Sequence, residues 1–415
     1  MRFIFCLVLY HFIMFGVGFD FFPISIRSLF SVIGLILLFR DRKYIVLPRK
    51  DKKLWVNLVV SLVLLLLIAT LTAFINSTFD SFFFKFPVQV LLSFLSNYVL
   101  VFIMGKLIKK QITVDLIKKF YVYACLFECF MALMFFIFPS IRYMVYSHLS
   151  LSALAVRALE WRLDSTVRLI GLGARAFLGG IGLAIGIFLA STLINKSNKS
   201  NVVFLFLVMI IISVVGSLIV RTTLVGMLLS VVYIILRQDI KLKNKIYVVS
   251  IMALLFIGAI NLYTMFFENS TMMGDAFHRA FSLFYNYEGN GEFSDLQSYS
   301  DTSVYPKTYK TWVIGDGLMA DPYNPETAYY RNVDIGYART IWGIGIIGLV
   351  VYVLVNYYII RLTKFPFLEL LLLLGAFFII MFKGICQFSN FLGPFIVLPI
   401  YSSIIQKKRI KLKTK

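Results

Sequence analysis

The stretch LWVNLVVSLVLLLLIATLTAFI, residues 54–75, decides the fold class. A helix needs about 20 consecutive apolar residues to cross the hydrocarbon core of a bilayer, and this stretch supplies them without one charged side chain. A mostly basic cluster, Arg49–Lys53, comes directly before it. Similar apolar runs recur along the chain, separated by charged residues or by clusters of Pro, Asn and Ser. We therefore expect helices that span a membrane.

The composition agrees with a membrane protein. Of the 415 residues, 60% are hydrophobic and 15% are charged, against about 25% charged in soluble domains. A single soluble core could not bury so much apolar surface, which excludes a cytosolic enzyme, a secreted disulfide scaffold and a disordered chain. The cysteines lie in or beside apolar runs, and we expect buried, unpaired thiols at Cys6, Cys125, Cys129 and Cys386.

The apolar runs predict an all-α polytopic membrane protein with about 12 transmembrane helices in a single membrane domain, residues 1–415. The runs are 3–19, 25–39, 54–75, 87–105, 120–138, 176–194, 202–220, 222–236, 246–266, 336–358, 366–383 and 391–405.

The basic residues predict the orientation of these spans. The net charge of +21 comes from 41 Lys and Arg against 20 Asp and Glu. Most of the basic residues fall in every second connection and in the C-terminal tail, which is typical of cytoplasmic loops. We therefore expect both termini in the cytoplasm. The same argument explains the positive charge without a nucleic-acid partner.

Two connections on the predicted outer side, about 139–175 and about 267–335, are much longer than a turn requires, and long loops are usually functional. The first contains five arginines, no lysine and only two acids. The planar fork of Arg suits phosphate. Arg168 and Arg175 at the membrane edge therefore favour an anionic ligand over lipid headgroups, although Asp164 could instead pair with Arg168 along a helix.

Arg221 lies between two apolar runs with no acid nearby in the sequence. A charge at membrane depth is costly and suggests function, the alternative being a turn that reaches lipid phosphates. In the second long loop Arg279 has His278 beside it, and a local pair with Asp275 is the simpler interpretation there.

The second long loop is rich in acids and aromatic residues, among which are Asp316 and Asp334. Aromatic faces and carboxylate acceptors together suit a sugar, and the alternative is an aromatic belt at the membrane interface. Gly315 and Gly317 would let the backbone turn tightly. The aromatic residues are Tyr285, Tyr287, Tyr299, Tyr305, Tyr309, Trp312, Tyr323, Tyr329 and Tyr330, with Tyr337 just beyond.

A few polar residues fall inside the apolar runs. Glu128, Glu369 and Lys383 could each pair within the helix bundle, and we expect Lys383, near the outer end of its helix, to face the cavity or the headgroups. Of the histidines, His11 in the first run and His148 in the first long connection fit a structural role better than a catalytic one. The sequence has no P-loop, metal-ligand cluster or nucleophile motif. An enzyme of this kind would work without a metal or cofactor, on an activated substrate.

Three segments of the chain resemble the bacterial O-antigen polymerases (Wzy-type), which are related to the O-antigen ligases. One is residues 167–175, an Arg-Gly segment before a mid-chain helix. Another is residues 216–222, a turn of small residues, Ser, Arg and Thr between two spans. The last combines Gly315-Asp316-Gly317 with residues 334–339 and 342–348, at the end of the large outer loop.

The resemblance implies a membrane glycosyltransferase in the bacterial inner membrane that uses an undecaprenyl-pyrophosphate-linked donor on the periplasmic face. It implies membrane lipids and a chain-length regulator protein as partners. We expect arginines to stabilise the pyrophosphate, with Arg221 also catalytic, and a base for the acceptor hydroxyl at Asp334, or alternatively at His278. Tyr337 and Asp316 would bind sugar. The pyrophosphate arginines would be Arg168, Arg175, Arg221, Arg279 and Arg339.

Two related functions remain open from the sequence. A flippase for the same lipid-linked unit would have a similar length and number of spans, but its loops are usually short. An O-antigen ligase usually has a His in the large loop near the last segment, where this chain has Asp334. Both features favour a polymerase.

Overall fold

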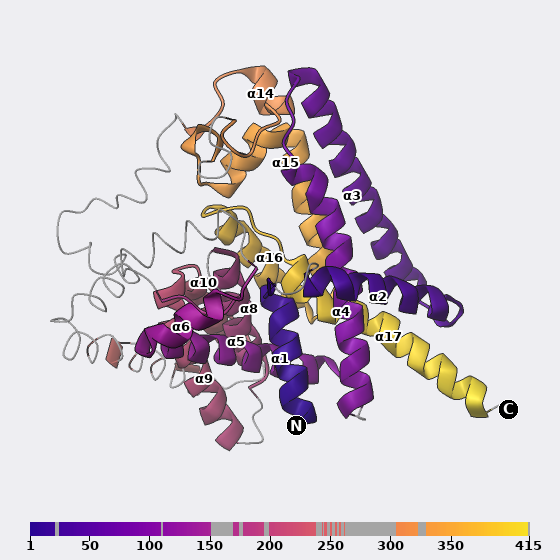
Figure 1. The fold of residues 1–415 in the computed structure, drawn as a ribbon, viewed down its shortest axis with the longest axis vertical. Coiled ribbons are helices and arrows are strands. Elements are labelled where there is room, and N and C mark those ends of the chain that lie inside the picture. The colour runs from indigo at the N-terminus through magenta and orange to yellow at the C-terminus, as the bar shows by residue number, and fades with distance from the viewer. Residues whose placement is uncertain are drawn as a thin grey trace. The chain divides into compact units, whose positions relative to one another are not determined.

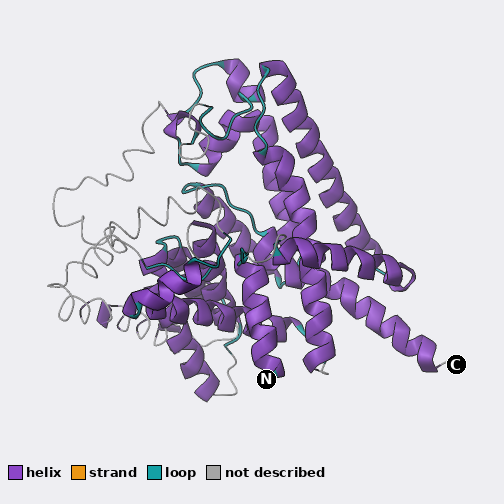
Figure 2. Cartoon of the chain, in the orientation of Figure 1, coloured by secondary structure: helices purple, strands orange, loops and turns teal. Residues whose placement is uncertain are grey.

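The structure is a computed structural model that describes residues 1–20, 25–108, 111–150, 169–173, 177–194, 199–237, 304–322 and 329–413, with isolated positions between 243 and 261. Over these residues the chain is helical, and its only extended pairings are isolated bridges between Phe19 and Leu149 and between Ala320 and Tyr329 (Figure 2).

Helices occupy each predicted span except 246–266, which lies mostly outside the described residues (Figure 1). Short helices also form within the two long connections, at α6 (Pro139–Tyr146) and α14 (Tyr309–Ile314). The helices at the predicted spans are α1 (Arg2–Phe15), α2 (Ile26–Asp41), α3 (Arg49–Asn76), α4 (Phe82–Ile108), α5 (Val114–Ile137), α8 (Phe177–Thr192), α9 (Lys199–Ile219), α10 (Thr223–Leu236), α15 (Gly336–Leu362), α16 (Phe367–Met381) and α17 (Ser389–Lys413).

The lengths of the helices support a membrane protein. Within the described residues α3, α4, α5, α9 and α15 are long and apolar enough to cross a bilayer, and α1, α8, α10 and α16 are shorter apolar helices. The four cysteines are unpaired and buried, as predicted. The number of spans and the side on which each end lies stay predictions.

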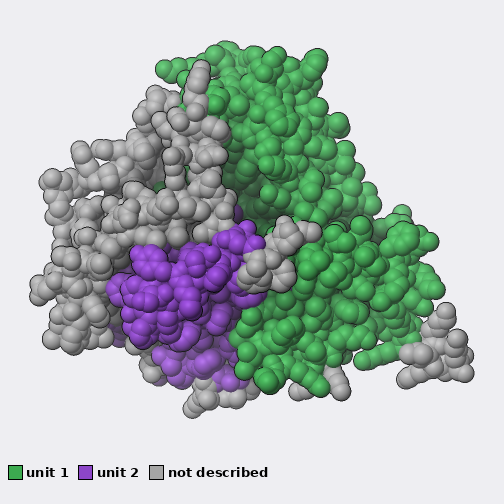
Figure 3. All heavy atoms as spheres, viewed as in Figure 1, with its two compact units in different colours: residues 1–9, 23–117, 297–415 green, residues 10–22, 118–296 purple. Residues whose placement is uncertain are grey.

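The chain divides into two compact units (Figure 3). Unit 1 comprises Met1–Leu9, Pro23–Ile117 and Gln297–Lys415, and unit 2 comprises Tyr10–Phe22 and Lys118–Leu296. That the whole chain forms one membrane domain stays a prediction, and each unit is described by itself.

Small residues set the helix packing in unit 1. A Cβ on Gly34 of α2 would lie 2.3 Å from the carbonyl oxygen of Leu95 in α4, so the two helices approach backbone to backbone. A Cβ on Gly105 of α4 would meet the Tyr401 hydroxyl of α17 at 1.8 Å. Close approach at glycines is typical of helices packed in a membrane, where dispersion contacts replace the hydrophobic effect.

Unit 2 is built around α8. Residues Gly179–Ser191 of this helix are all buried. The carbonyl oxygen of Gly182 accepts the Tyr121 hydroxyl at 3.2 Å and the Cys125 thiol at 3.6 Å, both from α5. On α10, a Cβ at Gly226 would lie 2.2 Å from the Ala184 carbonyl oxygen. The glycines of α8 and α10 thus bring three helices into close contact.

Candidate functional site

Helix α15 in unit 1 is interrupted near its outer-loop end. Gly345 has φ +67° and ψ −178°, which is not helical. Next to this break the loop donates to helix carbonyls: Asp316 N lies 2.6 Å from Trp342 O, and Gly317 N lies 3.1 Å from Gly343 O. The loop therefore satisfies backbone groups beside the break, which membrane proteins require at interrupted helices. The Gly-Asp-Gly and Trp-Gly-Ile-Gly parts of the third sequence segment form one junction.

The end of α3 holds the same loop from the other side. Three side chains at and after this helix end donate to three consecutive loop carbonyls. The bonds are Thr72 Oγ1 to Ile314 O at 2.9 Å, Asn76 Nδ2 to Gly315 O at 2.9 Å and Thr78 Oγ1 to Asp316 O at 2.8 Å. The junction is therefore fixed by side chains as well as by α15.

Asp80 fixes the next part of the loop. Its Oδ2 accepts the backbone N–H groups of Met319 at 2.8 Å and Ala320 at 3.0 Å, and its Oδ1 accepts that of Phe82 at 2.8 Å. Sequence reasoning did not find this residue. The signal was present, because Asp80 follows the apolar run 54–75 in a polar cluster on the predicted outer side.

Asp316, a predicted sugar ligand, has both carboxylate oxygens engaged. Thr311 Oγ1 donates to Oδ1 at 2.8 Å, and the Tyr330 hydroxyl donates to Oδ2 at 3.1 Å. Burial raises the pKa of Tyr330 and the Asp316 carboxylate raises it further, while Arg331 opposes both effects. These contacts show that Asp316 organises the loop. A role in binding sugar would come in addition to this one.

Two arginines face aromatic rings at this junction. The guanidinium carbon of Arg339 lies 3.7 Å from the centroid of the Tyr329 ring. Arg331 lies over Tyr330 and Trp342, at 5.4 and 5.6 Å from their centroids. The Nε atom of Arg339 is buried and has no hydrogen-bond partner among the described residues. A buried donor of a charged group without a partner is costly, so this arginine is suited to an anionic ligand.

Asp334, the predicted base, precedes α15 by two residues. Its side chain is 57% exposed, and its Oδ2 lies 3.7 Å from Nζ of Lys383, just beyond α16. The Lys383 side chain is 54% exposed, so this ion pair is not buried within the bundle. Since both groups are accessible, the ion pair can open when a substrate hydroxyl approaches.

Tyr337 lies one residue inside α15. Its hydroxyl donates to the carbonyl oxygen of Phe378 at 2.8 Å, and its ring packs edge-on against Phe382 at 5.0 Å. The hydroxyl is thus used in helix packing, which leaves the ring face as the part available to a sugar.

The other two sequence segments meet in unit 2. The backbone N–H of Leu169 donates to the carbonyl oxygen of Leu218 at 3.2 Å, which joins the Arg-Gly segment to the end of α9, just before Arg221. Arg221 itself is partly exposed, in the turn between α9 and α10. The turn is closed by Thr223, whose N–H donates to Val220 O at 3.0 Å. The segment 169–173 and Arg221 are therefore neighbours in the fold.

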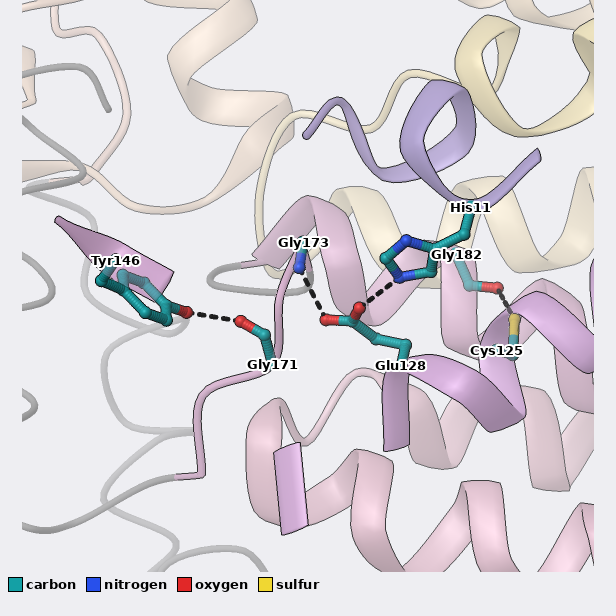
Figure 4. Close-up of polar contacts among 7 residues, drawn as sticks. All are labelled: His11, Cys125, Glu128, Tyr146, Gly171, Gly173 and Gly182. Carbon is teal, nitrogen blue, oxygen red and sulfur yellow. Dashed lines mark hydrogen bonds and ion pairs between the residues drawn. The ribbon is translucent and has the colours of Figure 1, made fainter. Parts of the chain in front are cut away.

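A buried polar group holds segment 169–173 in place (Figure 4). Nε2 of His11 lies 2.5 Å from Oε2 of Glu128, and both side chains are fully buried. The other oxygen, Oε1, accepts the N–H of Gly173 at 2.9 Å. Nearby, the Tyr146 hydroxyl donates to Gly171 O at 2.5 Å. The expected pairing of Glu128 is confirmed, and its partner is a histidine 117 positions earlier.

The predicted residues therefore fall into two groups. Asp316, Asp334, Tyr337 and Arg339 belong to unit 1, and Arg221 belongs to unit 2. Four predicted site residues lie outside the described residues: Arg168, Arg175, His278 and Arg279.

The described residues contain no group of three or more His, Cys, Asp or Glu that could hold a metal ion. Comparison of the chain with protein-family models, with curated proteins and with solved structures found no match.

Proposed function

We propose that this chain is a membrane glycosyltransferase that polymerises undecaprenyl-pyrophosphate-linked O-antigen repeat units on the periplasmic face of a bacterial inner membrane. The observation that carries the proposal is Arg339, whose buried Nε has no partner among the described residues. A guanidinium with a buried, unpartnered Nε beside an outer loop suits the pyrophosphate of a lipid-linked donor, because charge-assisted hydrogen bonds strengthen in a low-dielectric site.

The proposed reaction forms one glycosidic bond at the expense of another. The hydroxyl oxygen of an acceptor unit attacks the anomeric carbon of the donor sugar. The bond from that carbon to the pyrophosphate breaks, and undecaprenyl pyrophosphate leaves with the electron pair. The hydroxyl proton passes to a base, for which Asp334 is the first candidate and His278 the second. Arginine charge stabilises the leaving group, so no metal is needed.

The surroundings of Asp334 support its part in this reaction. The carboxylate is accessible to a substrate hydroxyl, and the ammonium group of Lys383 lies 3.7 Å from it. The Tyr329 ring beside Arg339 is exposed and offers a flat surface for the sugar next to the reacting carbon.

The first experiment is deletion of the gene in its own host, followed by gel analysis of the surface lipopolysaccharide. A core carrying a single repeat, with the ladder gone, supports a polymerase. A core without any repeat contradicts it and indicates a ligase or a flippase. The lipid-linked pool then separates these two, because long chains accumulate without a ligase and single units without a flippase.

Complementation with Arg339→Ala tests the observation itself. We expect polymerisation to fall by roughly 100-fold, as for loss of one transition-state donor, at an unchanged membrane level of the protein. Arg409→Ala is the matched control, because Arg409 is an exposed arginine near the end of α17. Equal ladders from the two variants would exclude Arg339 from the pyrophosphate site.

A further inference from the structure

An open cavity beside α14 in unit 1 has a composition suited to a sugar. Its volume is about 480 Å³, and the described residues that line it are Tyr305, Pro306, Lys307 and Trp312. Cavities of about 300–1,000 Å³ with apolar walls and few polar groups are typical of small-molecule sites. Two of the lining residues are aromatic and one is a cation.

The aromatic wall of this cavity is preorganised. The rings of Tyr305 and Trp312 are stacked, with centroids 5.9 Å apart and planes inclined by 8°. Nε1 of Trp312 donates to Pro306 O at 2.7 Å, which fixes the indole and uses its only donor. What the wall offers a ligand is therefore ring surface rather than hydrogen bonds. A fixed surface costs little entropy when a ligand binds.

The loop segment that lines the cavity is also held by helix α15. Nε1 of Trp342 in α15 donates to Val304 O at 2.8 Å, and Tyr305 packs against the small apolar cluster around Trp342 and Val333. On α14, Thr311 precedes Trp312 and donates to Asp316. The cavity is thus built onto the same junction that carries the proposed polymerisation site.

Lys307 brings a positive charge to this cavity. Its side chain is exposed. Among the described residues that line the cavity there is no acid to neutralise it. An ammonium group beside aromatic rings is suited to a carboxylate on a ring-shaped, otherwise uncharged ligand. We propose that the Tyr305–Lys307–Trp312 cavity is a subsite for an acidic sugar, such as a uronic acid, of the growing chain. The assignment of the sugar to that chain rests on the proposed function.

The test measures binding by the full-length protein in neutral phosphatidylcholine nanodiscs, using saturation-transfer NMR. The probes are methyl β-D-glucuronide and methyl β-D-glucoside, which differ only in the carboxylate at C6. We expect stronger binding of the glucuronide. Lys307→Gln should weaken glucuronide binding by about tenfold, as for one charge-assisted contact, and leave glucoside binding unchanged. Trp312→Leu should weaken the binding of both probes.

Lys310→Gln is the matched control, because Lys310 is an exposed lysine three residues further on that does not line the cavity. Equal binding of the two probes, or equal effects of the two lysine variants, would overturn the proposal. Unchanged glucuronide binding by Lys307→Gln in the neutral nanodiscs would also overturn it. The protein could bind the glucuronide while deletion of its gene leaves the ladder intact. That result would keep the acidic-sugar subsite and reject the polymerase.

Discussion

Glu128 shows how one buried residue can serve a distant segment. Its carboxylate bonds to His11 through one oxygen and to the backbone of Gly173 through the other. In an apolar bundle each of these groups would be costly without its partner. The pair therefore ties the end of α1 and the segment 169–173 to α5, beside the turn that carries Arg221.

Replacing Glu128 alone should destabilise the protein strongly. In Glu128→Leu the buried His11 Nε2 and Gly173 N–H both lose their partner, and we expect a loss of about 3–5 kcal/mol. Thermal unfolding in detergent measures the effect. The double variant His11→Leu/Glu128→Leu removes both polar side chains and should recover part of the loss. A double variant less stable than the single one would contradict this account.

Arg221→Ala should abolish polymerisation and leave membrane insertion intact. The reason is that Arg221 lies in the turn directly after α9, whose Leu218 is bonded to Leu169 of the Arg-Gly segment, and a guanidinium at that place suits pyrophosphate. Repeat ladders and immunoblots of membrane fractions measure both outcomes. Arg237→Ala, at the other end of α10, is the control and should keep its ladder. Full activity of Arg221→Ala would remove this residue from the pyrophosphate site.

At the scale of the element, α15 is the helix whose interruption creates the candidate site. Gly345 has a backbone conformation that only glycine adopts readily. Facing it, Gly315 has φ +85°, and a Cβ there would lie 2.7 Å from the Gly345 nitrogen. The two glycines allow loop and helix to approach within backbone contact, which brings Asp316 next to Trp342.

Gly345→Ala should disrupt this junction. The new Cβ would lie 2.1 Å from the Val313 carbonyl oxygen at φ +67°, so we expect a loss of at least ~3 kcal/mol together with loss of the ladder. Gly375→Ala is the control. Gly375 lies inside α16 with nothing within 4 Å of a Cβ, and there Ala should stabilise by up to about 1 kcal/mol. Thermal unfolding curves of both variants measure these effects. Equal melting temperatures would contradict the claim that the backbone at Gly345 requires glycine.

At the scale of the whole molecule, ion pairs between aspartates and lysines connect helix ends in unit 1. Asp51 pairs with Lys364, which links the start of α3 to the turn after α15. Asp41 pairs with Lys408 at 2.7 Å, which links the end of α2 to α17. These contacts bring together two connections predicted to be cytoplasmic, 40–53 and 361–364, and the C-terminal tail. The loop junction at residues 314–320 lies at the other ends of α3 and α15 (Figure 1).

The Asp41 contacts should make stability depend on pH. Burial by itself would raise the pKa of Asp41, but the hydrogen bonds from Arg40 and Lys408 outweigh it and hold this pKa below its usual value. The stabilisation is therefore complete above pH ~4, the unfolded pKa, and is lost as pH falls through the lower folded pKa. Melting temperatures of the native protein and Asp41→Asn should differ at pH 7 and converge in acid. A constant difference would contradict this linkage.

The sequence predicted the fold class and most helices, because each span carries its own apolar run and needs no distant partner to be identified. The family resemblance also named Asp316, Asp334 and Arg339 as candidate site residues. Sequence reasoning could not find Asp80 as a residue of the site. Asp80 matters through bonds to the backbone of residues 319 and 320, and backbone partners far along the chain leave no pattern in composition.

The amino-acid sequence by itself determined that this chain is a bundle of apolar helices with positive connections, since bilayer thickness and charge act on each segment separately. Only the tertiary structure decided which polar groups meet. His11 lies 117 positions from Glu128, and Thr78 lies 238 positions from Asp316. Such pairs form because a buried polar group needs a hydrogen-bond partner. Which partner lies within reach depends on how the helices pack.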